Sequence, residues 1–170
     1  SMTVSSLNAI FVYKYAAVLE DAGHPASDQP KLTVQVTNQS GNQIGGACGT
    51  FDVYAGQSGQ NFHNCGGVKW LNWSTAAIDL SAYIGQTITI EFTTRDCAQG
   101  GHFGYAYIWA TCMPLVQDAA FCAGQSAFLQ APTGFQTYHW TTGQSTPSIT
   151  VTNPSPGSSY LVTLGSVGNQ

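Results

Sequence analysis

Residues 78–112 constrain the fold more than any other part of the chain, because their apolar side chains recur at every second position. Ile88, Ile90 and Phe92 alternate with threonine and glutamate. After a loop with paired glycines, a second run alternates small residues with large aromatics, namely Phe103, Tyr105, Tyr107 and Trp109. A period of two is typical of a strand with one buried face. We therefore expect two strands, the second resting on a core with its small face and offering its aromatic face to a partner.

The rest of the chain repeats this pattern and contains almost nothing that favours a helix. Strand-like runs, separated by polar and glycine-rich turns, occupy residues 9–19, 31–38, 49–55, 68–77, 87–94 and 103–111. The turn Ser40-Gly41-Asn42 suits a hairpin. Many short strands with polar turns predict an all-β sandwich or barrel. The pattern changes after Cys112, so we expect one domain over residues 1–114 and a second over residues 115–170.

The composition argues against several classes of partner. Only 7% of the 170 residues are charged, and the net charge is −4. Nucleic acid and anionic membranes attract clustered lysine and arginine, which this chain lacks. No apolar run reaches the roughly 20 residues of a membrane span. A surface of uncharged polar residues is typical of secreted and cell-surface β-proteins, so we expect a secreted piece of a longer protein.

Five cysteines suit an oxidising compartment and favour disulfides. Their spacing pairs Cys48 with Cys65 and Cys97 with Cys112, and each link would be worth about 3 kcal/mol in the chain-entropy model. Cys122 would then need a partner elsewhere, or it would remain a free buried thiol.

Two sets of residues could hold a metal ion. Zinc is an alternative to the disulfides, because His63 stands close to Cys65 and Cys97 stands close to His102. Neither spacing matches a compact zinc motif, so the sequence favours disulfides.

Calcium is the second possibility, because carboxylates gather after the first predicted strand. Glu20, Asp21 and Asp28 lie within one short segment, and Asp96 would join them if its loop lay alongside. Oxygen ligands from loops suit Ca²⁺, and we expect Glu20, Asp21 and Asp96 to be its ligands in a structural site. The alternative is a solvated turn in which Asp21 accepts hydrogen bonds from backbone N–H groups.

Aromatic residues form the main candidate binding surface, and they are Tyr54, Trp70, Trp73, Tyr105, Tyr107 and Trp109. Exposed rings of this kind stack on sugars or on peptide side chains, whereas the alternative is that they fill the core. Trp70 and Trp73 are three residues apart and would point to opposite faces of a regular strand. We expect His24, Asp96 and His102 to border a ligand site together with Trp70 or Trp73.

The sequence favours binding over catalysis. A His–Asp pair could act as an acid–base device, but no Gly-x-Ser-x-Gly segment presents a nucleophile. Glu20 and Glu91 are the only glutamates available to a two-carboxylate glycosidase. We therefore expect no enzymatic activity.

Several motifs together resemble a known family. They are VLEDAGHP at 18–25, QP at 29–30, ACG at 47–49, IDLSAYIGQ at 78–86 and DCAQGGHFGYAYI at 96–108. This pattern is similar to a jelly-roll module of very large surface proteins that gliding Bacteroidetes export through the type IX secretion system. The segment after residue 114, with Tyr138-x-Trp140-x-x-Gly143 and Gly157-x-x-Tyr160-x-Val162-Thr163, resembles the Ig-like or PKD-like repeats that accompany that module.

The resemblance implies a fold and a function. The fold is a jelly-roll β-sandwich, similar to carbohydrate-binding and MAM-like modules, followed by a small Ig-like sandwich. The function is that of a gliding-motility-associated adhesin at the cell surface, which binds an extracellular glycan or surface polymer. The module usually has Asp where this chain has Trp109, which weakens the case for calcium and supplies an aromatic contact instead. The alternatives are a passive stalk, a docking module for the secretion or motility machinery, and a targeting module of a secreted hydrolase.

Overall fold

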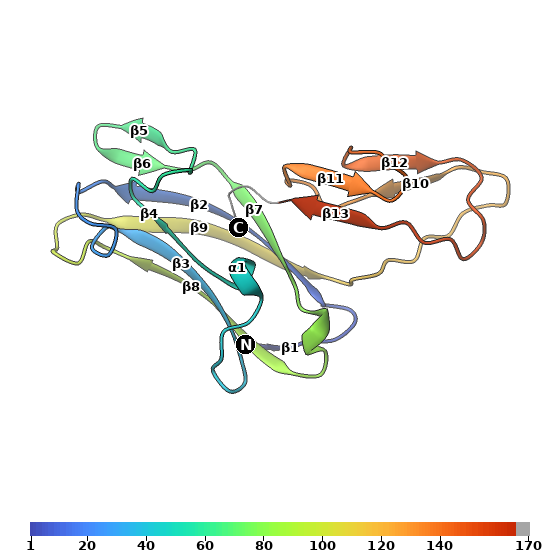
Figure 1. Ribbon diagram of the computed structural model, residues 1–170, viewed down its shortest axis with the longest axis horizontal. Helices are drawn as coiled ribbons and strands as arrows, with labels where there is room; N and C mark the ends of the chain where they lie inside the picture. Colours follow the sequence, from blue (N-terminus) through green and yellow to red (C-terminus); the bar gives the residue numbers. More distant parts are fainter. Residues whose placement is uncertain (166–170) are drawn as a thin grey trace. The chain divides into compact units, whose positions relative to one another are not determined.

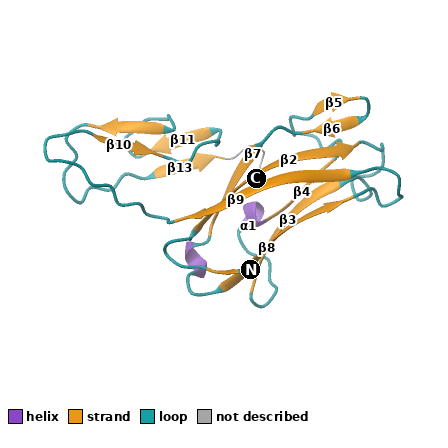
Figure 2. Cartoon of the chain, turned by 180° about the vertical axis from the view of Figure 1, so that it is seen from behind, coloured by secondary structure: helices purple, strands orange, loops and turns teal. Residues whose placement is uncertain are grey.

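The computed structural model describes residues 1–165, apart from the side chains of Ala47 and Cys48. The chain divides into two compact units, Ser1–Leu115 and a smaller unit that begins at Val116 (Figure 1). Strands make up almost all of its regular structure, and the helices are single turns (Figure 2). The predicted all-β class is confirmed.

One antiparallel sheet of the first unit contains four strands in the order β1-β8-β3-β4. Their bounds are Met2–Thr3 for β1, Lys31–Asn38 for β3, Thr50–Tyr54 for β4 and Thr87–Arg95 for β8. The strands β3 and β4 pair from Lys31↔Tyr54 to Gln35↔Thr50. Between them, a turn closed by Asn38 and Asn42 and the single-turn helix α1 (Gly46–Gly49) reverse the chain, as the Ser40-Gly41-Asn42 turn predicts.

The other sheet is built around the long strand β2 (Ile10–Glu20), which pairs with strands on both sides. On one side lie β7 (Ser74–Asp79) and β6 (Val68–Trp70), with β5 (His63–Cys65) beyond β6. On the other side lies β9 (Gly104–Met113), which pairs with β2 from Ile10↔Met113 to Leu19↔Gly104. All these pairings are antiparallel.

The predicted single strand over residues 68–77 is wrong, because β6 and β7 are separate strands. Leu71 follows β6, is buried, and donates its backbone N–H to the carbonyl of Ala17 at 2.9 Å. Residues 71–73 are irregular, and the Leu71 hydrogen bond keeps them next to β2. Before them, β6 pairs with residues 18–20 of β2, and after them, β7 pairs with residues 10–15. An apolar run in the sequence does not reveal such a break in pairing.

The core lies between the two sheets, as alternation in the sequence predicts. The inward face of β2 carries Phe11, Tyr13, Tyr15, Ala17 and Leu19, which are all buried. Leu32, Val34 and Val36 of β3 and Ile88 of β8 close the core from the opposite sheet, and each has no exposed surface. Aromatic rings meet across the layers, with centroids of Tyr13 and Phe92 5.3 Å apart in an edge-to-face contact. Burying such side chains supplies most of the stability of the sandwich.

The strand β9 is an edge strand among the described residues, since it pairs with β2 alone. Its alternation follows the prediction, with the aromatic side chains on the outer face. The inner face is only partly covered: Ala106 packs against the core, whereas Ile108 is 36% exposed. The strand β9 stands at the edge of its sheet, because β8, its neighbour in sequence, belongs to the other sheet. Side chains at such an edge have a neighbouring strand on one side only, so they are covered less well.

The second unit is a small pair of two-stranded antiparallel sheets. Strands β10 (Ala127–Gln130) and β12 (Ser148–Val151) form one, and β11 (Thr137–Trp140) and β13 (Val162–Gly165) form the other. Phe135, Tyr138, Trp140 and Ile149 are buried between them. The indole N–H of Trp140 donates to the carbonyl of Thr146 at 2.8 Å, so the largest core side chain also has its polar atom satisfied.

The predicted Cys97–Cys112 disulfide is wrong. Cys97 precedes β9 and Cys112 lies near its end, so about 30 Å of extended strand separates them. Both are free thiols, and the Cys112 sulfur instead contacts the sulfur of Met2 at 3.8 Å. Cys65 and Cys122 are also free and exposed. The side chain of Cys48, the predicted partner of Cys65, lies outside the described residues.

Candidate functional site

The outer face of β9 carries a row of exposed aromatic side chains, Phe103, Tyr105, Tyr107 and Trp109, which we call the aromatic face. Phe103 immediately precedes β9, and the others occupy alternate positions along it. Tyr107 is 58% exposed and Trp109 is 50% exposed, which is far more than core aromatic side chains show. The row exists because every second side chain of a strand points the same way.

The rings of the aromatic face contact one another. Phe103 and Tyr105 stack with centroids 5.9 Å apart, and Tyr105 meets Tyr107 edge to face at the same separation. Trp109 lies opposite Lys14 of β2, and the Lys14 ammonium sits 5.6 Å from the centre of the indole ring. Phe103, Tyr105 and Tyr107 are therefore joined by ring contacts, and Trp109 at the end of the row lies beside the positive charge of Lys14.

The aromatic face continues across the sheet through Val18. Val18 pairs with Tyr105 on one side and with Trp70 on the other, and paired residues of antiparallel strands point to the same face. Trp70 in turn stacks on His63 of β5, with ring centroids 4.1 Å apart. Trp73 lies outside any strand and is 55% exposed, so the expectation that Trp70 and Trp73 face opposite sides of one strand does not apply.

Such a surface can bind sugars or other flat apolar groups. Tyrosine and tryptophan offer large rigid rings together with a polar O–H or N–H, and they lose little conformational entropy on binding. The Nδ2 atom of Asn72, 3.3 Å from the His63 ring, adds an amide that can hydrogen-bond near Trp70. Stacking on rings and hydrogen bonding from neighbouring amides are the two kinds of contact that hold a hydroxylated ring.

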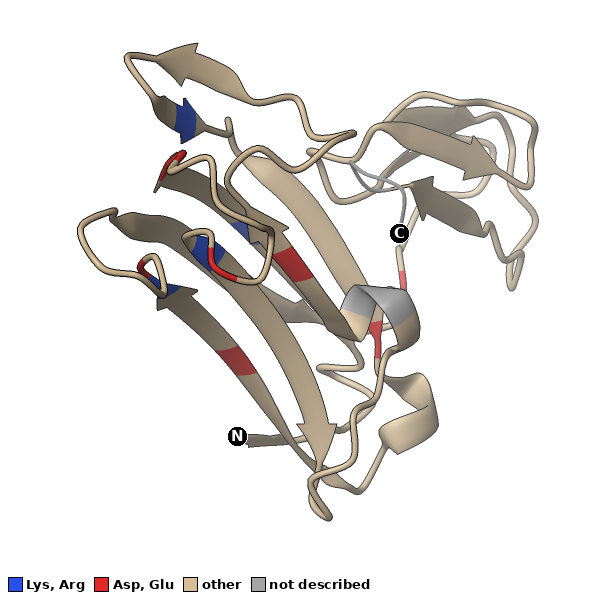
Figure 3. Cartoon of the chain, turned by 60° about the vertical axis from the view of Figure 1, so that its left-hand side comes forward, with Lys and Arg blue, Asp and Glu red and all other residues tan. Residues whose placement is uncertain are grey.

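Within the described part of the chain, the charged residues lie almost entirely in the first unit, where Lys14, Lys31, Lys69 and Arg95 stand on four different strands and form no basic patch (Figure 3). Each of the four cations has a contact: Lys31 pairs with Asp52, Lys69 with Asp21, Arg95 donates to the carbonyl of Ser27, and Lys14 lies over Trp109.

The structure does not bring the predicted calcium ligands Glu20, Asp21 and Asp96 together as a cluster. Asp21 accepts hydrogen bonds from the Gly23 N–H at 3.1 Å and from the amide of Gln29 at 2.8 Å. The Gly23 hydrogen bond is the largest cause that lowers the pKa of Asp21, and Gln29 and the nearby Lys69 add to it against desolvation. Asp21 is thus occupied as a turn-forming group.

The other two carboxylates accept hydrogen bonds from the start of β9. Asp96 accepts from the Gly104 N–H at 2.9 Å, and Glu20 accepts from the Phe103 N–H at 3.4 Å. These bonds fix the loop that enters β9. Calcium binding stays a prediction.

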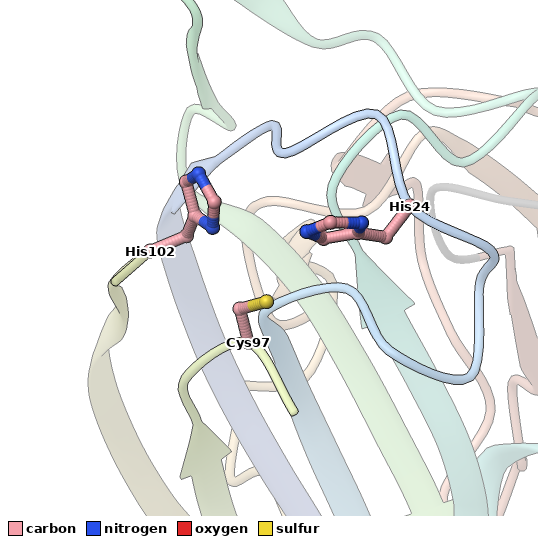
Figure 4. A group of neighbouring side chains, drawn as sticks. All are labelled: His24, Cys97 and His102. Atoms are coloured by element: carbon pink, nitrogen blue, oxygen red, sulfur yellow. The ribbon is translucent and has the colours of Figure 1, made fainter. Parts of the chain in front are cut away.

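His24 and His102, which we expected to border a ligand site, do meet in the structure. Their ring centroids are 5.5 Å apart, and the rings are nearly perpendicular. Cys97 lies beside them, so that one donor atom from each of the three side chains lies within 4.8 Å of the others (Figure 4). We call these three residues the His–Cys cluster. The sequence offers Cys97 and His102 as possible zinc donors but favours a disulfide for Cys97, and the approach of His24 to both depends on a loop far away in the chain.

The residues expected to bind a ligand do not all lie together: Trp70 pairs with Val18 near the end of β2 that His102 approaches, whereas Trp109 lies further along. Trp109 pairs with Lys14 of β2, whereas His102 precedes Phe103, whose carbonyl accepts from the N–H of Glu20 at the far end of that strand. Six residues of extended strand correspond to about 20 Å. Trp109 belongs to the aromatic face, and His24 and His102 belong to the cluster in the loops.

Comparison of the chain with models of protein families, with curated proteins and with solved structures found no match. Among the described residues, no helix has the length and apolar character needed to cross a bilayer.

Proposed function

We propose that this chain is a non-catalytic fragment of a secreted cell-surface adhesin, and that its aromatic face binds an extracellular glycan. The observation that carries the proposal is the exposure of four neighbouring aromatic side chains on one face of β9. An exposed patch of this kind marks an interaction site more often than a passive surface. Aromatics that served only the core would lie between the sheets, as Tyr13 and Phe11 do.

Glycan is the favoured ligand because the surface is apolar, nearly uncharged and set on a rigid sheet. Lys14 lies at one end of the row and Glu20, whose carboxylate accepts from the Phe103 N–H, lies at the other, so neither a highly charged polymer nor nucleic acid is matched electrostatically. A sheet that is already ordered loses little entropy when it binds, which favours affinity from a small number of ring contacts. The binding is an equilibrium, with no bond made or broken.

The secreted location rests on the charge-poor composition and on the resemblance to type IX-secreted surface proteins. The cysteines no longer support it, because the described thiols are free. Its partner would be a glycan or other polymer outside the cell.

A docking module for the secretion or motility machinery is the second candidate, and one observation favours it. The long edge of β9 has no strand partner among the described residues, and such an edge can accept an added strand from another protein. A stalk would make no use of the exposed aromatics of β9, whereas a targeting module of a secreted hydrolase would bind its ligand through them.

A glycan array probed with the full chain tests the proposal, with an array of extended peptides as the second arm. We expect binding to a restricted set of glycans, lost in the Tyr107→Ala and Trp109→Ala variants. Phe128→Ala is the matched control, because Phe128 is a similarly exposed aromatic (64%) in the second unit. Binding to peptides alone would replace the glycan proposal by the docking function.

A further inference from the structure

We propose that His24, Cys97 and His102 form a mononuclear transition-metal site, with Zn²⁺ as the ion. The three side chains come from two loops, 21–30 after β2 and 96–103 between β8 and β9, and they point toward one another (Figure 4). The site is independent of the aromatic face and of the glycan proposal.

The donor geometry is close to what a zinc ion needs. One nitrogen from each histidine and the Cys97 sulfur all lie within 4.8 Å of one another. Zinc bonds of about 2.0–2.3 Å in a tetrahedron place neighbouring donors about 3.3–3.8 Å apart. Small rotations of the side chains therefore suffice to close the site. A fourth position is left for water or an external ligand, as in zinc sites with three protein donors.

The burial of the cluster is a second observation that points to a ligand. Cys97 is only 6% exposed, and its two histidine neighbours are half-buried. The Nδ1 atom of His102 is itself buried and has no hydrogen-bond partner in the described part of the chain. A buried polar atom without a partner is costly, and a metal bond or a hydrogen bond formed on ligand binding would satisfy it.

The two loops are connected by hydrogen bonds that hold the donors in place. The Cys97 N–H donates to the carbonyl of His102 at 2.9 Å, which fixes two of the donors relative to each other. The Ala98 N–H donates to the carbonyl of Asp28 at 2.9 Å, and the Gln99 amide donates to the Asp28 carboxylate at 3.0 Å. These bonds tie the loop that carries Cys97 to the loop that carries His24. A preformed site binds a metal without first ordering the chain.

The tight turn between Cys97 and His102 depends on two glycines. Gly100 has φ +80° and Gly101 has φ +86°, conformations that other residues adopt only with strain. The Gly100 N–H donates to the carbonyl of Cys97 at 3.1 Å and closes the turn. The turn returns the chain so that His102 and Cys97 stand side by side.

The donor types select the class of metal. Imidazole and thiolate suit zinc and other borderline-soft transition metals, whereas Ca²⁺ and Mg²⁺ require oxygen. On binding, the Cys97 thiol gives its proton to the solvent as the zinc–sulfur bond forms, and the two imidazoles bind in their neutral form. The Gln99 N–H lies 3.4 Å from the Cys97 sulfur and can donate to the thiolate, which is the outer contact that metal-bound sulfur commonly has.

A titration of the reduced full chain with Co²⁺, followed by competition with Zn²⁺, tests this proposal. We expect one equivalent of Co²⁺ to produce a thiolate-to-cobalt charge-transfer band, which Zn²⁺ abolishes and Ca²⁺ leaves unchanged. Cys97→Ser should remove the band. His24→Ala and His102→Ala should each weaken zinc binding by at least about 100-fold, since changes to outer contacts alone cost 10–100-fold.

The matched controls are His63→Ala and Cys65→Ser, which change the other neighbouring His and Cys in the first unit and should leave the titration as in the wild type. His24→Ala guards against a folding artefact, because His24 is a half-buried loop residue and its loss should leave the unfolding temperature of the metal-free chain unchanged. The proposal is overturned if no equivalent binds at micromolar concentrations. Binding that persists in both Cys97→Ser and His24→Ala also overturns it.

Discussion

Gly104 is the position where the two layers of the first unit come closest at the start of β9, and Gly104→Ala tests that closeness. The backbone of Gly104 is not in the left-handed region, so the substitution introduces no backbone strain. An added Cβ would lie 2.9 Å from the carbonyl oxygen of Arg95, 3.0 Å from Cβ of Pro30 and 3.2 Å from Cδ2 of Leu19. Ordinary contacts between such atoms are about 3.5 Å or longer.

The expected loss of stability depends on whether the three neighbouring groups can move away from the added Cβ. The Arg95 carbonyl is main chain at the end of β8, Pro30 is a rigid ring, and Leu19 has no exposed surface, so none of the three can yield freely. Overpacking of this kind costs about 1–3 kcal/mol, and the lower backbone entropy of alanine in the unfolded chain returns about 0.5–1 kcal/mol. Three close contacts with atoms that cannot move place the cost near the middle of its range, at about 2 kcal/mol, so the net loss is about 1–1.5 kcal/mol. This loss corresponds to a drop in Tm of roughly 4–10 °C for a domain of this size.

Differential scanning calorimetry of the full chain measures this drop. Gly165→Ala is the matched control, because Gly165 also lies in an extended strand but its added Cβ would meet the hydroxyl of Thr137. A side-chain hydroxyl can turn away, so we expect the control to lower Tm by less than about 2 °C. A Gly104→Ala variant as stable as the wild type would show that the layers do not approach as described and would refute the reasoning.

Two further predictions concern acid stability and thiol access. Desolvation is the largest single influence on the pKa of Asp52 and raises it, but hydrogen bonds from Lys31 and Thr33 and the charges of Lys31 and Arg95 together lower the pKa overall. The stabilising effect of Asp52 is therefore present above the unfolded carboxyl pKa of about 3.9 and is lost as the pH falls through the folded pKa. The Tm of wild type should therefore exceed that of Asp52→Asn at pH 6, and the difference should shrink as the pH falls below about 3.9; a constant difference would contradict this. Alkylation followed by mass spectrometry should modify the exposed Cys112 rapidly and the buried Cys97 slowly, and equal rates would contradict their assigned burial.

Much of the fold of the first unit could be predicted from the sequence, because alternation reports directly on which strand faces are buried. The predicted strand over residues 31–38 matches β3, and the run over 87–94 matches β8 to within one residue. The break between β6 and β7 could not be predicted, since it depends on where Leu71 bonds to β2 rather than on local composition. The unpaired edge of β9 could not be predicted from the sequence either, because alternation does not show how many neighbouring strands a strand has.

The candidate site was harder to predict for a different physical reason. The outward direction of Tyr105, Tyr107 and Trp109 follows from their period of two, although their exposure depends on whether another layer covers them. The approach of His24 to Cys97 depends on two loops far apart in the sequence. Counting residues between cysteines led to a wrong pairing, because the intervening segment is an extended strand that separates its ends.

The aromatic face is the basis of the proposed function, and a calorimetric titration with the strongest glycan from the array tests it most directly. The comparison is between wild type, the double variant Tyr107→Ala/Trp109→Ala, and Phe128→Ala. Each ring contact is worth about 0.5–1.5 kcal/mol, so we predict that the double variant binds about 5- to 100-fold more weakly while Phe128→Ala matches wild type. Because both rings are half exposed, the double variant should keep the unfolding temperature of the wild type. Equal affinity of wild type and the double variant would contradict the account.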